Sequence, residues 1–229
     1  MSPFRGRPHV QNGLIAARQP HSVAAEAYRT LRTNIQFSSL DRGVRTLIVT
    51  SPGQDEGKST VLANLAITIA ESGKTVIATD CDLRRPGLHA IFGLQNSAGI
   101  TNMVLEETCD PPLQGTMVPN LRVLASGPLP PNPSELLASE RMAKIIARLA
   151  QEADFVLFDS PPVAVVSDAA ALATRVDGVL LVIDAGRTRR DAARQAKEAL
   201  ERVGARLLGV VLNNVKPERR LYAYHQSRE

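Results

Sequence analysis

The sequence RTLIVTSPGQDEGKST, residues 45–60, is the strongest indication of the architecture of the chain. It opens with an apolar, β-branched run, passes through a loop of small and polar residues, and continues from Lys58 into the helical pattern VLANLAITIA. Gly57, Lys58 and Ser59 match the end of the phosphate-binding pattern G-x-x-x-x-G-K-[ST], which requires a strand before the loop and a helix after it. Pro52 stands where the pattern has its first glycine. The strand–loop–helix context still predicts a nucleotide site.

The loop residues suit a polyphosphate ligand. Backbone N–H groups at a helix N-terminus attract anions, and Gly57 lets the backbone approach closely because it has no Cβ. We expect Lys58 to reach the β- and γ-phosphates and the Ser59 hydroxyl to bind Mg²⁺. The residues assigned to ATP binding are Gly53, Gln54, Asp55, Glu56, Gly57, Lys58, Ser59, Thr60 and Asn213.

Two acidic residues, Asp55 and Glu56, directly precede Gly57 in this loop. Carboxylates beside a polyphosphate repel it unless they point away or engage Mg²⁺ or an arginine of a partner. The sequence leaves their role open.

Buried strands alternate with helical patterns along the chain, which is typical of a parallel α/β sheet. Near-continuous apolar runs indicate strands that are covered on both faces. The expected strands are 45–50, 75–80, 121–125, 155–159, 178–184 and 208–213, and the expected helices are 23–37, 58–72, 133–150, 167–174 and 189–203. We predict a doubly wound P-loop domain over 22–215, with a flexible N-terminal segment, 1–21, and a flexible tyrosine-containing tail, 216–229.

The composition argues against nucleic acid as a partner. Aromatic residues make up 3% of the 229 residues, and tryptophan is absent, so platforms for base stacking have little material. The net charge of +4 comes with basic clusters that we interpret as solvated surface. No run reaches the ~18 apolar residues of a membrane span, the N-terminus lacks the apolar run of a signal peptide, and there are two cysteines. We therefore expect a cytoplasmic chain.

Three aspartates follow predicted strands at the edge where the phosphate loop lies. Asp80 and Asp82 end the second strand, and Asp159 ends the strand FVLFD. Each alone would be a common turn or helix cap, but three carboxylates at the ligand-binding edge of a parallel sheet favour metal binding. Mg²⁺ takes oxygen ligands from one or two carboxylates, phosphate and water. Asp184, which also ends a strand, has no second signal and is assigned a structural role.

Four motifs together resemble the bacterial tyrosine kinases, the cytoplasmic autokinases of capsule and exopolysaccharide export. These are EAYRTLRTNI (26–35), DCDLRRPGLH (80–89), ASGPLPPNPSELLAS (125–139) and FDSPPVAVVSDA (158–169). The resemblance covers about residues 22–215 and implies a P-loop fold, ATP and Mg²⁺. It also implies kinship with partition-type ATPases, although Gly53 replaces their signature lysine.

The resemblance implies a role for each matching residue. Lys58 and Ser59 would hold phosphate and Mg²⁺, Asp80 would accept the proton of a tyrosine hydroxyl, and Asp82 and Asp159 would organise the metal. The catalytic set is therefore Lys58, Asp80, Asp82 and Asp159, and the metal set is Ser59, Asp82 and Asp159. The phosphoacceptors would be Tyr222 and Tyr224, two tyrosines where the family has a dense cluster.

The family also implies partners. The stripe Glu26, Arg29 and Arg32 on the first long helix matches a motif that joins subunits into a ring; without the resemblance it would be a solvated helix face. Tyr28, inside this helix, is expected to pack. A membrane-embedded polysaccharide co-polymerase would activate the kinase at the inner face of the membrane, and a cognate tyrosine phosphatase would reverse the reaction. The sequence does not distinguish a separate chain from a domain of a fused protein.

Two rival functions stay open on the sequence. One is a partition or positioning ATPase that hydrolyses ATP without a tyrosine acceptor. The other is an assembly module in which ATP controls oligomerisation. Phosphate transfer to a tail tyrosine would separate the kinase from both rivals.

Overall fold

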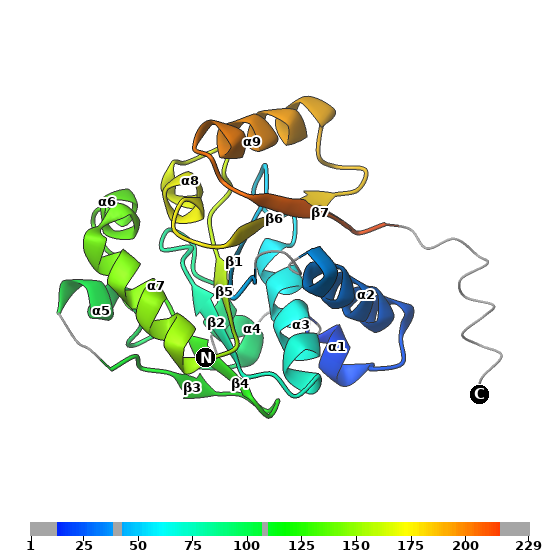
Figure 1. Ribbon diagram of the computed structural model, residues 1–229, viewed down its shortest axis with the longest axis horizontal. Helices are drawn as coiled ribbons and strands as arrows, with labels where there is room; N and C mark the ends of the chain where they lie inside the picture. Colours follow the sequence, from blue (N-terminus) through cyan, green and yellow to red (C-terminus); the bar gives the residue numbers. More distant parts are fainter. Residues whose placement is uncertain (1–12, 39–42, 107–109, 216–229) are drawn as a thin grey trace, which may run out of the picture.

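A seven-stranded sheet with helices on both faces forms the molecule in a computed structural model that describes residues 13–38, 43–106 and 110–215 (Figure 1). The strands are β1 (Thr46–Thr50), β2 (Val76–Asp80), β3 (Gln114–Gly115), β4 (Leu121–Leu124), β5 (Phe155–Asp159), β6 (Gly178–Asp184) and β7 (Leu207–Asn213). Their order is β3-β4-β2-β5-β1-β6-β7, and all neighbours are parallel except β3 and β4. The predicted doubly wound parallel sheet is confirmed.

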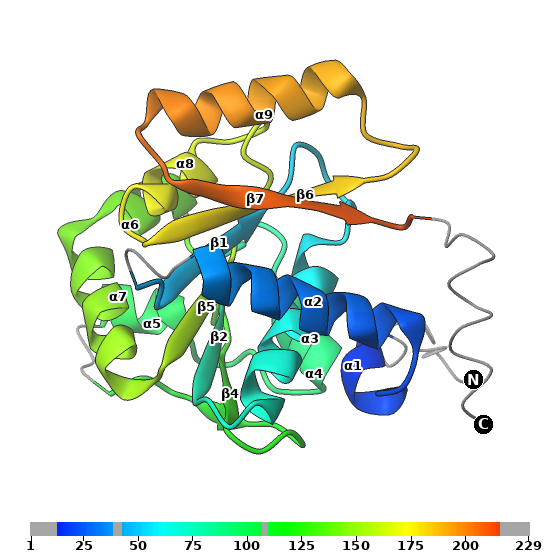
Figure 2. The same cartoon turned by 45° about the vertical axis from the view of Figure 1, so that its right-hand side comes forward.

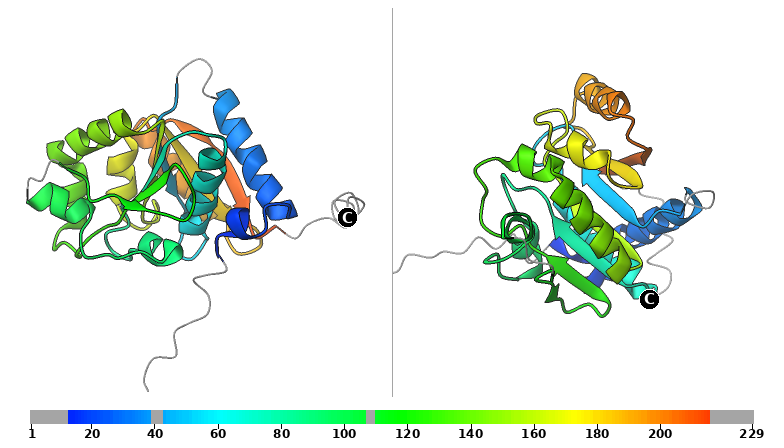
Figure 3. Two further views of the ribbon diagram at one scale, coloured as in Figure 1. Left: turned by 90° about the horizontal axis from the view of Figure 1, so that it is seen from below. Right: turned by 60° about the vertical axis from the view of Figure 1, so that its left-hand side comes forward.

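Helices cover both faces of this sheet (Figure 2 and Figure 3). They are α1 (Ile15–Arg18), α2 (Val23–Ser38), α3 (Lys58–Glu71), α4 (Leu88–Phe92), α5 (Ile100–Leu105), α6 (Pro133–Ala138), α7 (Glu140–Glu152), α8 (Asp168–Ala173) and α9 (Arg190–Arg202). One apolar core lies between the sheet and α1 to α4, and a second lies between the sheet and α5 to α9. Strand residues alternate between the two cores: Ile48 belongs to one, and Leu47 and Val49 to the other.

Helix α3 is buried all round, which explains the apolar pattern after the phosphate loop. Ten consecutive residues, 61–70, are buried because the sheet covers one side of the helix and α1 and α2 cover the other. A helix that is apolar on every side is typical of this position.

The N-terminal segment is ordered further toward its start than we predicted. Leu14 and Ala16 are buried, and the side chain of Asn64 in α3 bonds this segment at both ends. Its amide donates to the carbonyl of Gly13 over 2.6 Å, and its oxygen accepts the N–H of Ala16 over 2.9 Å. From Gly13 onward the prediction of a flexible segment is therefore wrong, whereas residues 1–12 lie outside the described residues.

The prediction of one helix over 133–150 is also wrong. Ser139 has an extended backbone, with φ −68° and ψ 152°, so the helix is interrupted there and the segment forms two helices, α6 and α7. Its hydroxyl accepts the N–H of Met142 over 3.1 Å and thereby caps α7.

Candidate nucleotide and phosphoryl-transfer site

The phosphate loop joins β1 to α3 at the carboxyl edge of the sheet. Gly57 has φ +89°, and a Cβ there would lie 2.1 Å from the side-chain nitrogen of Asn213. Only glycine fits this combination of left-handed backbone and close neighbour. Asp55 is also left-handed, with φ 58°. The loop therefore has a tight shape, and the end of β7 contacts it.

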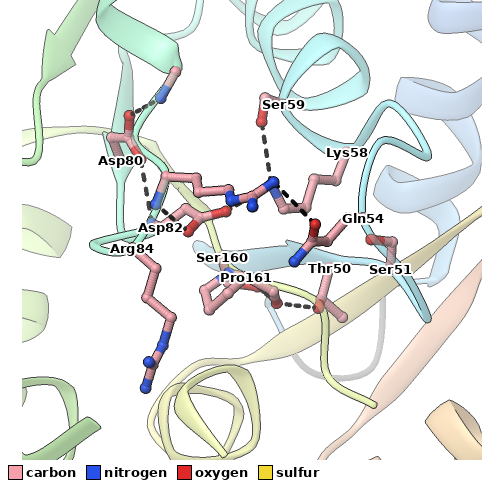
Figure 4. Close-up of polar contacts among 12 residues, drawn as sticks. Thr50, Ser51, Gln54, Lys58, Ser59, Asp80, Asp82, Arg84, Ser160 and Pro161 are labelled. Atoms are coloured by element: carbon pink, nitrogen blue, oxygen red, sulfur yellow. Dashed lines mark hydrogen bonds and ion pairs between the residues drawn. The ribbon is translucent and has the colours of Figure 1, made fainter. Parts of the chain in front are cut away.

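Lys58 forms the central ion pair of the site (Figure 4). Its Nζ lies 2.9 Å from Oδ2 of Asp82 and 3.5 Å from Oγ of Ser59. Both charged side chains are largely buried, with 14% of Lys58 and 6% of Asp82 exposed. Burial alone lowers the pKa of Lys58, but the charges of Asp159 and Asp82 reverse this, so the net pKa is raised. The ammonium is thus firmly charged before any phosphate arrives.

Asp80 and Asp159 lie side by side, because they are register partners at the ends of β2 and β5. Burial, together with the charge of Asp159, raises the pKa of Asp80 to about 8. The oxygens of Asp80 accept three backbone N–H groups, those of residues 82, 87 and 88, at 2.9–3.2 Å. In this arrangement Asp80 holds the loop between β2 and α4, and its fully buried carboxylate does not line the pocket.

The carboxylate of Asp159 is fully buried, and neither oxygen has a hydrogen-bond partner among the described residues. Burial raises its pKa, partly offset by the neighbouring Lys58 and Ser59. Buried acceptors without hydrogen-bond partners are rare, and a bound cation or water commonly accounts for them. Because no cluster of three or more His, Cys, Asp or Glu suited to a metal occurs within the described ranges, a bound Mg²⁺ would need other oxygen ligands as well. Ser59, Asp82 and Asp159 fit that requirement.

A cavity of about 280 Å³ opens beside the loop. Arg85 crosses it, donating from Nη1 to Oε1 of Gln54 over 2.9 Å. Arg84 extends away from Lys58 (Figure 4). It pairs instead with Asp168. The lining residues are Gln54, Asp55, Lys58, Ser59, Asp82, Arg84, Arg85, Pro161, Pro162, Val165 and Val166.

The structure separates the predicted nucleotide residues into two groups. Gln54, Asp55, Lys58 and Ser59 line the cavity, whereas Glu56 is turned into the protein and buried. The sequence analysis missed Arg84 and Arg85, although both lie in DCDLRRPGLH, and it missed the proline pair after Asp159. Two adjacent arginines immediately after the second acidic motif were the available signal.

The charged stripe on α2 is partly engaged within the chain. Glu26 and Arg29 pair with each other at 2.9 Å, one turn apart. Arg32 donates to the carbonyl of Thr68 in α3 over 2.8 Å. Tyr28 packs against the core beneath α2, and burial raises its pKa to about 12. Tyr28 is therefore a packing residue, as predicted; the predicted acceptors, Tyr222 and Tyr224, lie outside the described residues.

Comparison with known proteins places this site in context. Residues 47–228 match the family CbiA, described as the CobQ/CobB/MinD/ParA nucleotide binding domain. The tyrosine-protein kinase YwqD of Bacillus subtilis is 40% identical over 222 residues, which cover 96% of this chain and 94% of that protein.

Two solved structures are also similar. The chimerical protein CapA2B2 has a TM-score of 0.86 and 38% identity, over 90% of this chain and 91% of that one. The kinase domain of the Escherichia coli tyrosine kinase ETK also has a TM-score of 0.86, with 30% identity over 96% of this chain and 84% of that one. Within the described ranges, no helix has both the length and the apolar character needed to cross a bilayer.

Proposed function

Because the chain belongs to the bacterial tyrosine kinases, within the CobQ/CobB/MinD/ParA nucleotide-binding domains, we propose that it is an ATP-dependent protein-tyrosine autokinase regulating capsular or exopolysaccharide polymerisation and export. The observation that carries the proposal is the buried Lys58–Asp82 pair beside the unpartnered carboxylate of Asp159. Phosphoryl transfer depends chiefly on positioned cations and carboxylates of this kind.

The site residues take distinct parts in this proposal. Lys58 exchanges its contact with Asp82 for the phosphates of ATP, which frees the Asp82 carboxylate. Ser59, Asp82 and Asp159 would hold Mg²⁺, which when bound neutralises charge on the phosphates. The nucleotide contacts are proposed for the cavity-lining loop residues and for Asn213, which contacts the loop.

The proton acceptor for the tyrosine hydroxyl is proposed to be Asp80, which requires a rearrangement of the loop between β2 and α4. Asp82 already lines the cavity and is the competing acceptor. Hydrogen bonds in ligand-free sites often rearrange when substrate binds, so both carboxylates merit a direct test.

The proposed acceptor tyrosines follow β7 in the sequence. β7 ends beside the phosphate loop, and Tyr222 comes seven residues after Val215. A fully extended chain spans at most about 3.6 Å per residue, so seven residues allow the Cα of Tyr222 to reach up to about 25 Å from that of Val215. That reach supports transfer to Tyr222 or Tyr224 of a neighbouring subunit.

Mixing two inactive proteins tests this transfer. Lys58→Met keeps the tail but loses the ammonium that binds phosphate, and the double variant Tyr222→Phe/Tyr224→Phe keeps the site but loses the acceptors. With Mg-ATP, mass spectrometry should find phosphotyrosine on the Lys58→Met tail only in the mixture. No phosphotyrosine in the wild-type protein or in the mixture, with or without the cytoplasmic segment of the membrane partner, would reject the kinase function.

The assembly of the active form is part of the proposal. Family membership is the basis for proposing three partners. The first is a homo-oligomeric ring through Glu26, Arg29 and Arg32. The others are a membrane-embedded co-polymerase, which recruits the chain to the inner face of the membrane, and a cognate phosphatase. The exposed side chain of Glu26 supports the ring contact. The partition-type alternative is disfavoured because Gly53 replaces the signature lysine, and phosphate release without phosphotyrosine would be its distinguishing result.

A further inference from the structure

The two acidic residues of the phosphate loop face different ways. Asp55 is exposed and lines the cavity, whereas 5% of Glu56 is exposed and its carboxylate points into the protein. Its Oε1 accepts a hydrogen bond from the hydroxyl of Thr188 over 2.8 Å, and its Oε2 is buried without a hydrogen-bond partner among the described residues. One of the two acids that would repel a polyphosphate is thus turned away from the phosphate side.

The hydroxyl of Thr188 is itself held in place. It accepts the backbone N–H of Asp184 over 3.0 Å, which directs its only proton toward Glu56. The carboxylate of Asp184 in turn accepts the side-chain amide of Asn214 over 3.0 Å. The turn between β6 and α9 therefore presents an oriented donor to the loop.

Two further donors from the same side hold the loop backbone. Arg187 donates from Nη1 to the carbonyl of Asp55 over 3.1 Å, and Asn213 donates from Nδ2 to the carbonyl of Glu56 over 3.0 Å. The loop adopts left-handed backbone at Asp55 and at Gly57, and such conformations persist where the surroundings hold them. The turn after β6 and the end of β7 supply that support.

We propose that Thr188 is a positioning residue for nucleotide binding, which holds the Glu56 carboxylate away from the phosphates and keeps the loop in its binding shape. The proposal rests on the nucleotide binding of the proposed function and is independent of the tyrosine acceptor. Without the hydroxyl, a buried carboxylate loses its hydrogen bond, and such groups are costly to leave unpaired. Glu56 then turns toward solvent and places a negative charge near the bound phosphates.

The test measures binding of fluorescent, non-hydrolysable ATP and of fluorescent ADP to the full chain. Thr188→Val should weaken ATP binding about tenfold, which corresponds to about 1.4 kcal/mol of binding free energy. Because ADP carries less negative charge than ATP, the affinity for ADP should fall less than the affinity for ATP. Thr188→Ser keeps the hydroxyl and should restore affinity, and Thr174→Val, which removes an exposed hydroxyl bonded to the carbonyl of Ala171 over 2.9 Å, is the matched control.

A charge-specific rescue distinguishes positioning from loss of packing. In the Thr188→Val background, Glu56→Gln removes the repelling charge and should recover most of the ATP affinity. The proposal would be overturned if Thr188→Val bound ATP as tightly as wild type does. It would also be overturned if Thr188→Val and the double variant Thr188→Val/Glu56→Gln showed the same loss of ATP affinity. Because direct binding is measured, a missing phosphotyrosine leaves this result unaffected, so the two proposals fail separately.

Discussion

Asp168 anchors the loop after β2, and removing its charge should measurably destabilise the fold. Its buried carboxylate accepts Nε of Arg84 over 2.7 Å and Nη2 over 3.2 Å, and it also accepts the hydroxyl of Ser134. These contacts join the acidic motif of β2 to α6 and α8. Asp168→Asn keeps the size of the side chain and removes the charge.

The loss of unfolding free energy expected for Asp168→Asn lies between two limits. A hydrogen bond to a charged group contributes about 1.5–3 kcal/mol, whereas an exposed ion pair contributes at most about 1 kcal/mol. Asp168 is fully buried but 41% of the Arg84 side chain is exposed, so screening reduces the larger figure. We expect the free energy of unfolding to fall by about 2 kcal/mol, which lowers Tm by about 4–8 °C in a domain of this size.

The pH dependence of this cost identifies the carboxylate as its source. Burial alone would raise the pKa of Asp168, but the hydrogen bonds from Arg84 and Ser134 outweigh it, so the pKa is lowered. A lowered pKa stabilises the folded state fully above the unfolded value of about 3.9, and this stabilisation is lost as the pH falls through the folded value. The difference between wild type and Asp168→Asn should therefore be constant from pH 6 to 8 and shrink below about pH 4.

Urea unfolding of both proteins from pH 3 to 8 measures this difference. Asp191→Asn is the control, because Asp191 forms an exposed ion pair with Arg194 at 3.5 Å. The reasoning would be refuted if Asp168→Asn lost no more unfolding free energy at pH 7 than the control variant does. It would also be refuted if that loss were unchanged at pH 3.

Three further predictions concern the loop and α2. Gly57→Ala should weaken ATP binding by at least tenfold, because φ is +89° and the new Cβ would collide with the amide of Asn213; a fluorescent ATP titration that matches wild type would contradict this. The tyrosinate absorbance of Tyr28 should appear with a midpoint near pH 12, and subtracting the Tyr28→Phe spectrum isolates it. Arg32→Ala should lower monomer stability in urea by about 1 kcal/mol, because its bond to the α3 carbonyl is lost, whereas Arg29→Ala, which loses only a surface pair, should change it little.

The sequence predicts the main strands well because burial on both faces leaves continuous apolar runs. The predicted ranges 155–159 and 178–184 coincide with β5 and β6. The short elements α1, α4, α5 and β3 escaped prediction because none of them carries a clear periodic apolar pattern. The break at Ser139 had a local signal, a serine followed by Glu140 at a helix start, but the apolar pattern on both sides concealed it.

In the candidate site, too, features with a local sequence signal could be predicted, and features that depend on distant contacts could not. Lys58, Asp82 and Asp159 could be predicted to meet, because parallel strands end at one edge of a sheet. The direction of Glu56 could not be predicted, because it depends on Thr188, 132 residues later in the chain. The engagement of Arg84 by Asp168 has the same origin, a contact across 84 residues that no local pattern encodes.

The charges at the sheet edge explain why a divalent cation suits this site. One ammonium, Lys58, lies among three buried carboxylates, Asp80, Asp82 and Asp159, so two negative charges remain uncompensated when all are ionised. The raised pKa values of Asp80 and Asp159 follow first from burial, and repulsion among the carboxylates adds to them. Phosphate that draws Lys58 away from Asp82 increases the imbalance, and a cation of charge +2 offsets the original excess. Metal and nucleotide should therefore bind cooperatively, and Asp159→Asn should reduce the gain in ATP affinity that Mg²⁺ provides.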